Sequence, residues 1–278
     1  MTLRRRAVLA TSTAAVASSA IAGQAHAAPK AEPWPLWEKH DPTATTTIDH
    51  APWGRFLAAH RREGTDGIAR LAYKAAQADR PALDADIARL AALPISRFNR
   101  GEQFAYWVNL YNMVTVQTVL RHYPVASIRD IKISPGWFST GPWGAKLVTV
   151  EGTALSLDDI EHRILRPIWR DPRIHYAVNC ASIGCPNLPS APFTAATTAA
   201  MLDQAARDFI NHPRGAAIES GRLVASSIFV WYASDFGPEA ADVIIHLRKF
   251  ARQDFYTALS HIRRVSEDRY DWSLNDAP

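Results

Sequence analysis

The chain has 278 residues and a formal net charge of +4 at pH 7. Arg4, Arg5 and Arg6 supply three of the positive charges, so the remainder carries about +1 and gives no argument for nucleic-acid binding. Only two cysteines are present, Cys180 and Cys185, which is far too few for a disulfide framework. A hydrophobic core must therefore hold the fold together, and the length favours one large domain over two small ones.

The N-terminus, residues 1–27, is typical of a signal peptide. The basic block of Arg4–Arg6 precedes an uncharged stretch rich in Ala, Ser, Thr and Val, which ends in the A-x-A cleavage pattern Ala25-His26-Ala27. Paired arginines before an apolar-x-Leu element favour the twin-arginine route, with Sec export as the alternative. We expect a periplasmic or otherwise exported protein, cleaved near Ala27. No other segment is apolar enough to span a bilayer, so we expect no transmembrane segment after cleavage.

Residues 28–49 form a lead-in rich in Pro and Thr, and residues 50–278 are predicted to be a single globular domain. Helical periodicity begins near Pro52 and recurs over residues 68–78 and 83–93. These helices are expected to form the scaffold.

The strongest predicted helix runs from Glu102 to His122, with Asn99 as its N-cap and Pro124 beyond its end. It is apolar nearly all round, which is typical of a central helix. Asn109 and Asn112 are three residues apart and so share a face of it. Buried amides need partners: these two either tie neighbouring backbone together or serve a site.

The second half of the chain mixes short strands with helices. A hairpin is predicted over residues 146–155 and a capping box at Ser156–Asp159, where a helix carrying Glu161 and Arg166 begins. Further along, the pattern predicts a strand over 173–179, a helix over 195–211, a hairpin turning at Ser220-Gly221 with a strand over 223–231, and two C-terminal helices. Without regular β-α-β alternation, this order indicates an α+β fold: a mostly helical single domain with a small antiparallel or mixed sheet.

The loop after residue 174 carries the residue types that chemistry needs. A cysteine nucleophile requires its thiolate, hence a nearby base such as His175, which an acid or amide then orients. His175 could equally be a structural residue. The spacing of His175, Cys180 and Cys185 offers only three obvious metal ligands, and no phosphate-binding glycine loop is present, so we expect no metal and no cofactor.

Several motifs resemble the family catalogued as domain of unknown function 547. They are FAYWVNLYNMVT, LSLDDIEHRILR, DPRIHYAVNCASIGCPNL, SDFG and YDWSLN, in consistent order over roughly residues 50–275. The resemblance singles out Asn109, Asn112, Glu161, Arg166, His175, Cys180, Cys185 and Pro186. It implies an exported or cytosolic globular domain without an assigned reaction. A remote likeness to papain- and transglutaminase-like thiol enzymes would require a permuted arrangement, because Cys180 follows His175.

These observations predict a thiol-dependent hydrolase or acyl transferase that acts on amide or acyl bonds of a small-molecule or peptide substrate in the cell envelope. Cys180 is the expected nucleophile, His175 its base and Glu161 the orienting acid. The expected binding and positioning residues are Asn109, Asn112, Arg166 and Cys185. The alternative is a non-catalytic envelope binding module, in which a Cys180–Cys185 disulfide stiffens a recognition loop.

Overall fold

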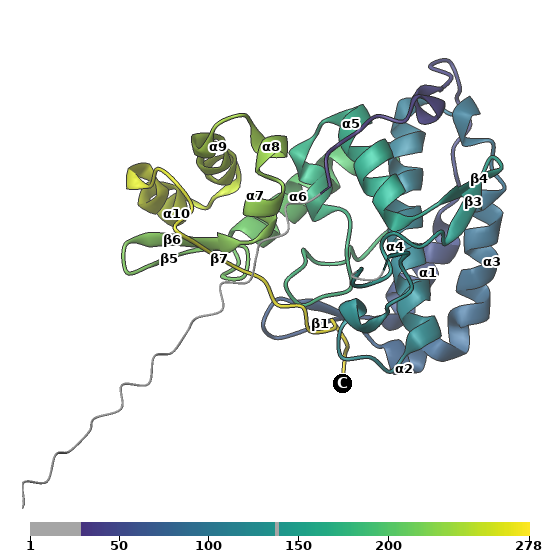
Figure 1. Cartoon of the computed structure of the whole chain (residues 1–278), viewed down its shortest axis with the longest axis horizontal. Coiled ribbons are helices and arrows are strands. Elements are labelled where there is room, and N and C mark those ends of the chain that lie inside the picture. The colour runs from purple at the N-terminus through teal and green to yellow at the C-terminus, as the bar shows by residue number, and fades with distance from the viewer. Residues whose placement is uncertain (1–28, 137–138) are drawn as a thin grey trace, which may run out of the picture.

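The computed structural model describes residues 29–136 and 139–278, so the predicted signal peptide lies outside the described residues. Helices predominate and the strands form small sheets, which confirms the α+β prediction (Figure 1). The α-helices are α1 (Ala51–His60), α2 (Tyr73–Ala76), α3 (Arg80–Ala91), α4 (Arg100–His122), α5 (Arg166–Trp169), α6 (Thr198–Ile210), α7 (Ile228–Trp231), α8 (Ala233–Phe236), α9 (Ala240–Phe250) and α10 (Gln253–Ala258). The strands are β1 (Arg61–Glu63), β2 (Ala69–Leu71), β3 (Val148–Val150), β4 (Thr153–Leu155), β5 (Ala216–Glu219), β6 (Arg222–Ser226) and β7 (Glu267–Arg269).

Helix α4 is central, as its sequence predicts. Its side chains from Glu102 to Leu120 are all buried, and α3 and the π-helix η5 (Asp159–Leu165) pack against it. The Asn99 side chain accepts a hydrogen bond from the backbone N–H of Glu102 at 3.0 Å, which confirms the predicted N-cap. None of the described helices combines the length and the hydropathy needed to cross a membrane.

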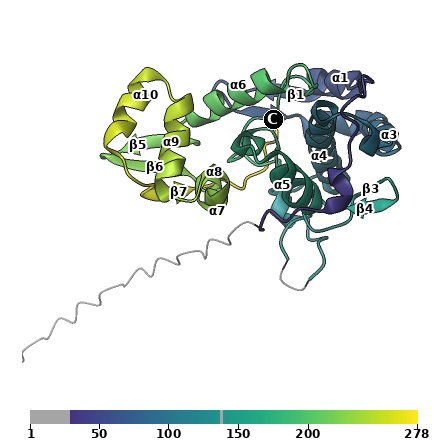
Figure 2. The same ribbon diagram turned by 90° about the horizontal axis from the view of Figure 1, so that it is seen from above.

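Two hydrophobic cores lie side by side. The larger surrounds α4, and the smaller lies among α6, α9 and the three-stranded sheet β5-β6-β7, in which β6 pairs antiparallel with β5 and parallel with β7. Figure 2 shows α9, α10 and this sheet at one end of the molecule and α1, α3 and α4 at the other. Ile174, Ala177 and Val178 pack into the larger core, whereas Tyr176 packs into the smaller one. The segment that leads to Cys180 therefore runs between the two cores.

Both predicted hairpins are present. β3 pairs with β4 through Glu151-Gly152, and β5 pairs with β6 through Ser220-Gly221. All four turn residues have positive φ, between 46° and 77°, as a type I′ turn requires. The strand predicted over 223–231 ends earlier, because β6 stops at Ser226 and α7 follows.

The prediction of a strand over residues 173–179 is wrong. The segment forms a 3-10 helix, η6 (Pro172–Tyr176), capped by the Asp171 side chain, which accepts from the backbone N–H of Arg173 at 2.9 Å. Its apolar residues alternate because Ile174 and Val178 pack into the larger core and Tyr176 packs into the smaller one. The segment therefore shows the apolar pattern of a strand without belonging to a sheet. The helix predicted over 68–78 is also partly wrong, since residues 69–71 pair with β1 as strand β2 before the short α2.

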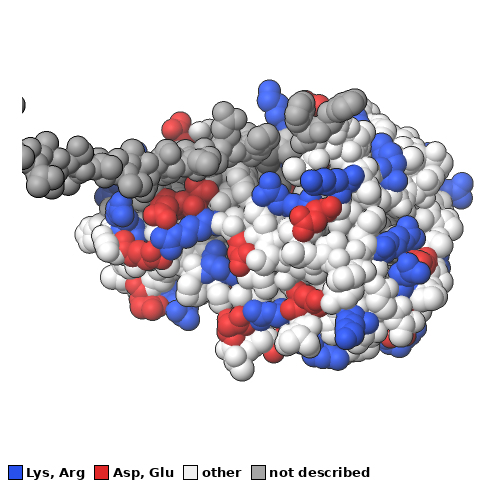
Figure 3. Space-filling view, turned by 60° about the horizontal axis from the view of Figure 1, so that its bottom comes forward, with Lys and Arg blue, Asp and Glu red and all other residues white. Residues whose placement is uncertain are grey.

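The two ends of the described chain pack onto the domain. In the lead-in, Trp37 is buried and its ring meets that of Trp107 edge-on at 5.1 Å. At the other end, the tail crosses the cysteine loop: Ile183 N–H donates to the Ser273 carbonyl at 2.8 Å, and Asn275 N–H donates to the Ala181 carbonyl at 3.1 Å. Lys and Arg are interspersed with Asp and Glu on the face that Figure 3 shows, so no field of a single sign covers it.

Candidate functional site

Asn112 joins the central helix to the start of the cysteine loop. Its amide donates to the Ala177 carbonyl at 2.9 Å and accepts from the backbone N–H of Asn179 at 2.8 Å. Asn109 makes the same pair of contacts with the backbone of Phe193, at 2.8 and 3.0 Å. Both amides are fully buried. They tie neighbouring backbone together, and Asn112 acts directly at the loop that carries Cys180.

The loop itself is tightly held by its own polar groups. The Asn179 side chain accepts from the backbone N–H of Ala181 at 2.8 Å and donates to the carbonyl of Pro186 at 2.7 Å. Ala181 has φ of 60°, a left-handed conformation that costs a residue with a Cβ roughly 1–2 kcal/mol. Such strain persists only where surrounding contacts enforce it, and it is concentrated at functional sites.

The Cys180 sulfur is surrounded by three polar groups. Cys185 Sγ lies 3.4 Å away, Ser182 Oγ 3.1 Å and the hydroxyl of Tyr270 3.0 Å. Tyr270 and Ser182 also contact one another, with 2.8 Å between their oxygens. Hydrogen bonding from Cys185, and then from Ser182 and Tyr270, lowers the pKa of Cys180, although burial and the charge of Glu161 oppose this.

Cys185 differs from Cys180 in exposure and in acidity. Its side chain is 4% exposed, whereas Cys180 is partly exposed. Burial and the neighbouring Cys180 raise the pKa of Cys185 well above its usual value. Both cysteines are free thiols in this structure. The two sulfurs thus form a contacting pair in which the less buried residue, Cys180, carries the more acidic thiol.

A second cluster of polar residues lies on the other side of the Cys180 backbone. The Arg166 guanidinium makes two hydrogen bonds to the carboxylate of Asp235, at 2.6 and 2.9 Å, and His175 Nε2 lies 2.8 Å from the same carboxylate. These contacts hold the pKa of Asp235 well below its usual range, although burial opposes them. The Tyr232 ring stacks on that of His175, with 4.0 Å between centroids.

Glu161 completes this buried cluster from the π-helix. Its carboxylate accepts from the Tyr111 hydroxyl at 3.1 Å and lies 3.8 Å from His175 Nδ1. Glu161 and Arg166 are five residues apart, and the backbone N–H of Arg166 donates to the Glu161 carbonyl. This i to i+5 hydrogen bonding of a π-helix places the two residues on the same side of the helix. Four of the predicted site residues, Glu161, Arg166, His175 and Cys180, are thereby collected into one region.

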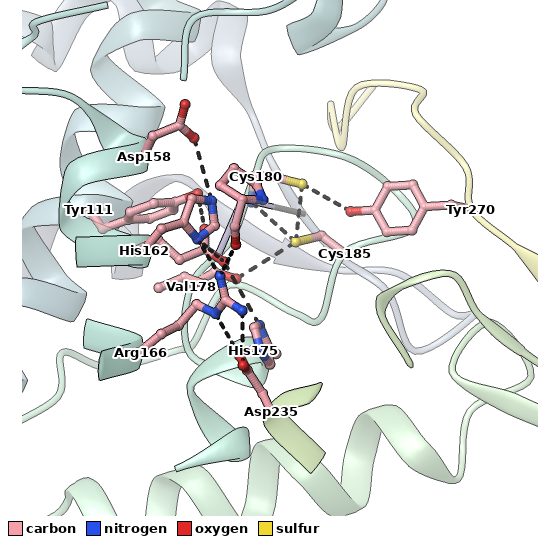
Figure 4. A network of polar contacts seen from close by, with 12 residues as sticks. Tyr111, Asp158, His162, Arg166, His175, Val178, Cys180, Cys185, Asp235 and Tyr270 are labelled. Atoms are coloured by element: carbon pink, nitrogen blue, oxygen red, sulfur yellow. Dashed lines mark hydrogen bonds and ion pairs between the residues drawn. The ribbon is translucent and has the colours of Figure 1, made fainter. Parts of the chain in front are cut away.

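The predicted direct pair of Cys180 and His175 is not formed in this structure. Among the described residues, no hydrogen bond joins the Cys180 sulfur to an imidazole. Figure 4 shows the sulfur of Cys180 directed toward Tyr270, while His175 lies beside Asp235 and Arg166. The closest acidic partner of His175 is Asp235 and not the expected Glu161.

Sequence reasoning did not assign Tyr270, Ser182, Asp235 or Tyr111 to the site. Tyr270 and Asp235 stand in the motifs YDWSLN and SDFG, so the pattern contained them but gave no reason to place them beside Cys180 and His175. A cavity of about 330 Å³ lies beside the Arg166–Asp235 pair, and its further lining includes Arg170, Ser234 and Pro33. Within the described part of the chain, no group of three or more His, Cys, Asp or Glu side chains is arranged to hold a metal ion.

Comparison with known proteins gives one match. Residues 95–210 match the family described as protein of unknown function, DUF547, which confirms the resemblance seen in the motifs. This range includes α4, the π-helix and the whole cysteine loop, but not Asp235 or Tyr270. No curated protein and no solved structure matches the chain, so the permuted papain-like arrangement stays a prediction.

Proposed function

We propose that this protein, whose residues 95–210 match the DUF547 family, is a thiol-dependent hydrolase or acyl transferase with Cys180 as its nucleophile. The observation that carries the proposal is the polar environment of the Cys180 sulfur. Cys185, Ser182 and Tyr270 all place a polar atom within 3.4 Å of this sulfur. Cys180 stands on a loop that is strained at Ala181, and it is the less buried of the two cysteines. A thiolate stabilised in this way is the reactive form of cysteine.

In the proposed reaction, the Cys180 thiolate attacks the carbonyl carbon of an amide or ester. A thioester forms, the amine or alcohol leaves, and water or a second acceptor then takes the acyl group. His175, fixed by Asp235 and stacked on Tyr232, is the proposed proton carrier. Its Nδ1 has no hydrogen-bond partner among the described residues, so this nitrogen is available to exchange a proton. Reaching the thiol from there requires the Cys180 side chain to rotate away from Tyr270.

An activated ester tests this proposal without knowledge of the natural substrate. The protein is mixed with p-nitrophenyl acetate, and the release of nitrophenolate and the mass of the protein are followed together. We expect a burst of nitrophenolate and an acetyl group on Cys180, both absent in Cys180→Ala and slower but present in Cys185→Ala, which keeps the contacts of Ser182 and Tyr270 with the sulfur. Acetylation of surface lysines alone would overturn the proposal.

The role of His175 has a matched control in His162, which is equally buried in the same cluster and contacts Arg166 Nη1 at 3.0 Å. His175→Gln should slow the loss of the acetyl group from Cys180 by at least about 100-fold, the size of a general acid–base contribution. His162→Gln should slow it much less. Equal effects of the two substitutions would show that His175 only supports the structure.

Export is part of the proposal and is supported by the N-terminal sequence. Replacing Arg5 and Arg6 with lysines retains the positive charge that Sec needs but removes the guanidinium pair. We expect this precursor to stay in the cytoplasm when cell fractions are probed with an antibody. Normal export of the variant would assign the protein to the Sec route.

One observation favours the binding module as a second candidate. Trp143, Trp231, Tyr270 and Trp272 form a cluster of partly exposed rings, with centroids between 4.6 and 5.7 Å apart, directly beside Cys180. A binding module needs this cluster but not the thiol. Ligand binding that survives Cys180→Ala and is lost in Trp231→Ala would favour it over the enzyme.

A further inference from the structure

The two cysteines are held so that their sulfurs meet. Four residues separate them, and the loop between them is fixed at several points. The backbone N–H of Cys180 donates to Cys185 Sγ at 3.1 Å, and that of Cys185 donates to the Ser182 carbonyl at 3.2 Å. The tail adds a bond from Gly184 N–H to the Asp271 carbonyl at 2.8 Å. With 3.4 Å between the sulfurs, the two atoms must approach by about 1.3 Å to reach the bonding distance of about 2.05 Å.

The pair is also asymmetric in the way that stepwise thiol–disulfide exchange requires. Cys180 is the less buried of the two residues, so its sulfur is the one that a substrate disulfide would meet first, while Cys185 is buried. The hydroxyls of Ser182 and Tyr270 contact the Cys180 sulfur, where they stabilise a thiolate both as the attacking group and as the leaving group of the reverse reaction. The pKa directions agree with this assignment, since that of Cys180 is lowered and that of Cys185 is raised.

We propose that Cys180 and Cys185 form a redox-active dithiol that exchanges with disulfide substrates, with Cys180 as the attacking thiol and Cys185 as the resolving thiol. This activity uses the same thiolate as the proposed function, but it requires neither acyl transfer nor His175.

The reaction proceeds in two displacements. The Cys180 thiolate attacks one sulfur of a disulfide R–S–S–R, the S–S bond breaks, and one RS⁻ leaves with its electron pair. Cys185 then gives its proton to the departed thiolate and attacks the Cys180 sulfur of the mixed disulfide. The second RS⁻ leaves, and a Cys180–Cys185 bond forms. Two electrons pass from the dithiol to the substrate, so one disulfide becomes two thiols while the protein becomes oxidised.

Glutathione disulfide is a suitable probe. Fully reduced protein is mixed with it under anaerobic conditions, samples are quenched with acid, and masses are measured over time. We expect the wild-type protein to convert to the intramolecular disulfide with release of two glutathione thiols. Cys185→Ser should stop at a stable mixed disulfide on Cys180, and Cys180→Ser should form neither product at a comparable rate. Cys185→Ala, which also lacks the resolving thiol, replaces Cys185→Ser if the serine disturbs folding.

The lifetime of the mixed disulfide decides the outcome. An oriented intramolecular thiol acts at an effective concentration far above millimolar glutathione, so the adduct should persist at least about 100-fold longer in Cys185→Ser than in the wild type. Equal lifetimes would overturn the inference, as would an intramolecular disulfide that forms only with strong oxidants. If the wild type is acetylated at Cys180 but its mixed disulfide does not resolve, the redox inference fails alone. Loss of acetylation with normal resolution would instead remove the proposed function.

Discussion

Replacing Asn112 with alanine tests whether the central helix fixes the cysteine loop. The substitution leaves the backbone N–H of Asn179 and the carbonyl of Ala177 buried without a partner. Each such group costs about 1–3 kcal/mol, so the free energy of unfolding should fall by about 2–6 kcal/mol. A typical domain has about 5–15 kcal/mol, so the variant should fold but unfold at a lower urea concentration.

Asn109→Ala is the matched control, since it removes the same two kinds of hydrogen bond but at Phe193, away from the sulfurs. Both variants should lose similar stability. Only Asn112→Ala should alter the pH dependence of Cys180 alkylation by iodoacetamide, measured with Cys185 replaced by alanine in every protein.

Two results would refute the reasoning. A loss below about 1 kcal/mol for Asn112→Ala would mean that water or a shifted backbone satisfies the orphaned groups. An equal change in Cys180 reactivity in both variants would mean that general loosening, and not the loop contact, controls the thiol.

Three further predictions concern stability and the tail. Burial lowers the pKa of His246 to about 4, so the unfolded state takes up a proton first as the pH falls. The resulting stability is complete above pH 6.5 and declines by about 3 kcal/mol between pH 6.5 and 4. His246→Gln removes the titrating group but keeps a polar side chain beside the Tyr176 hydroxyl, so it should reduce this slope in urea titrations. In Gly184→Ala, the new Cβ would lie 2.7 Å from the backbone nitrogen of Asp271, so the tail should detach and become sensitive to carboxypeptidase; unchanged digestion would contradict this. Ala181→Gly relieves the positive φ and should change unfolding free energy by no more than about 1 kcal/mol, whereas a larger loss would show that the Ala181 methyl packs more tightly than its strain suggests.

The sequence by itself determined the local elements whose causes lie within a few residues. The cap at Asn99, the capping box at Ser156 and the hairpin turns at Glu151-Gly152 and Ser220-Gly221 all formed as expected. Each depends on a side chain meeting backbone three residues away or on the φ that a turn requires. The burial of α4 also followed from its composition, because a helix that is apolar all round has no face for solvent.

Tertiary structure decided the parts that depend on which segments meet. The alternation in residues 173–179 resembled a strand, but two cores on opposite sides of a 3-10 helix produced it. Glu161 was expected to orient His175, yet Asp235, sixty residues further along the chain, takes the closer position. No local periodicity encodes such a contact, because it depends on how α8 packs.

The surroundings of Cys180 show the same division. Its loop and Cys185 were picked out from the sequence, whereas Ser182 was missed although it lies only two residues from Cys180. Tyr270 comes from the C-terminal tail, ninety residues away, and reaches the sulfur only because the tail bonds to the loop backbone at Ile183 and Gly184. The same bonds help to hold the Cys180 sulfur beside Tyr270 and not beside His175. The sequence therefore singled out Cys180 and its loop, and long-range packing decided which groups contact its sulfur.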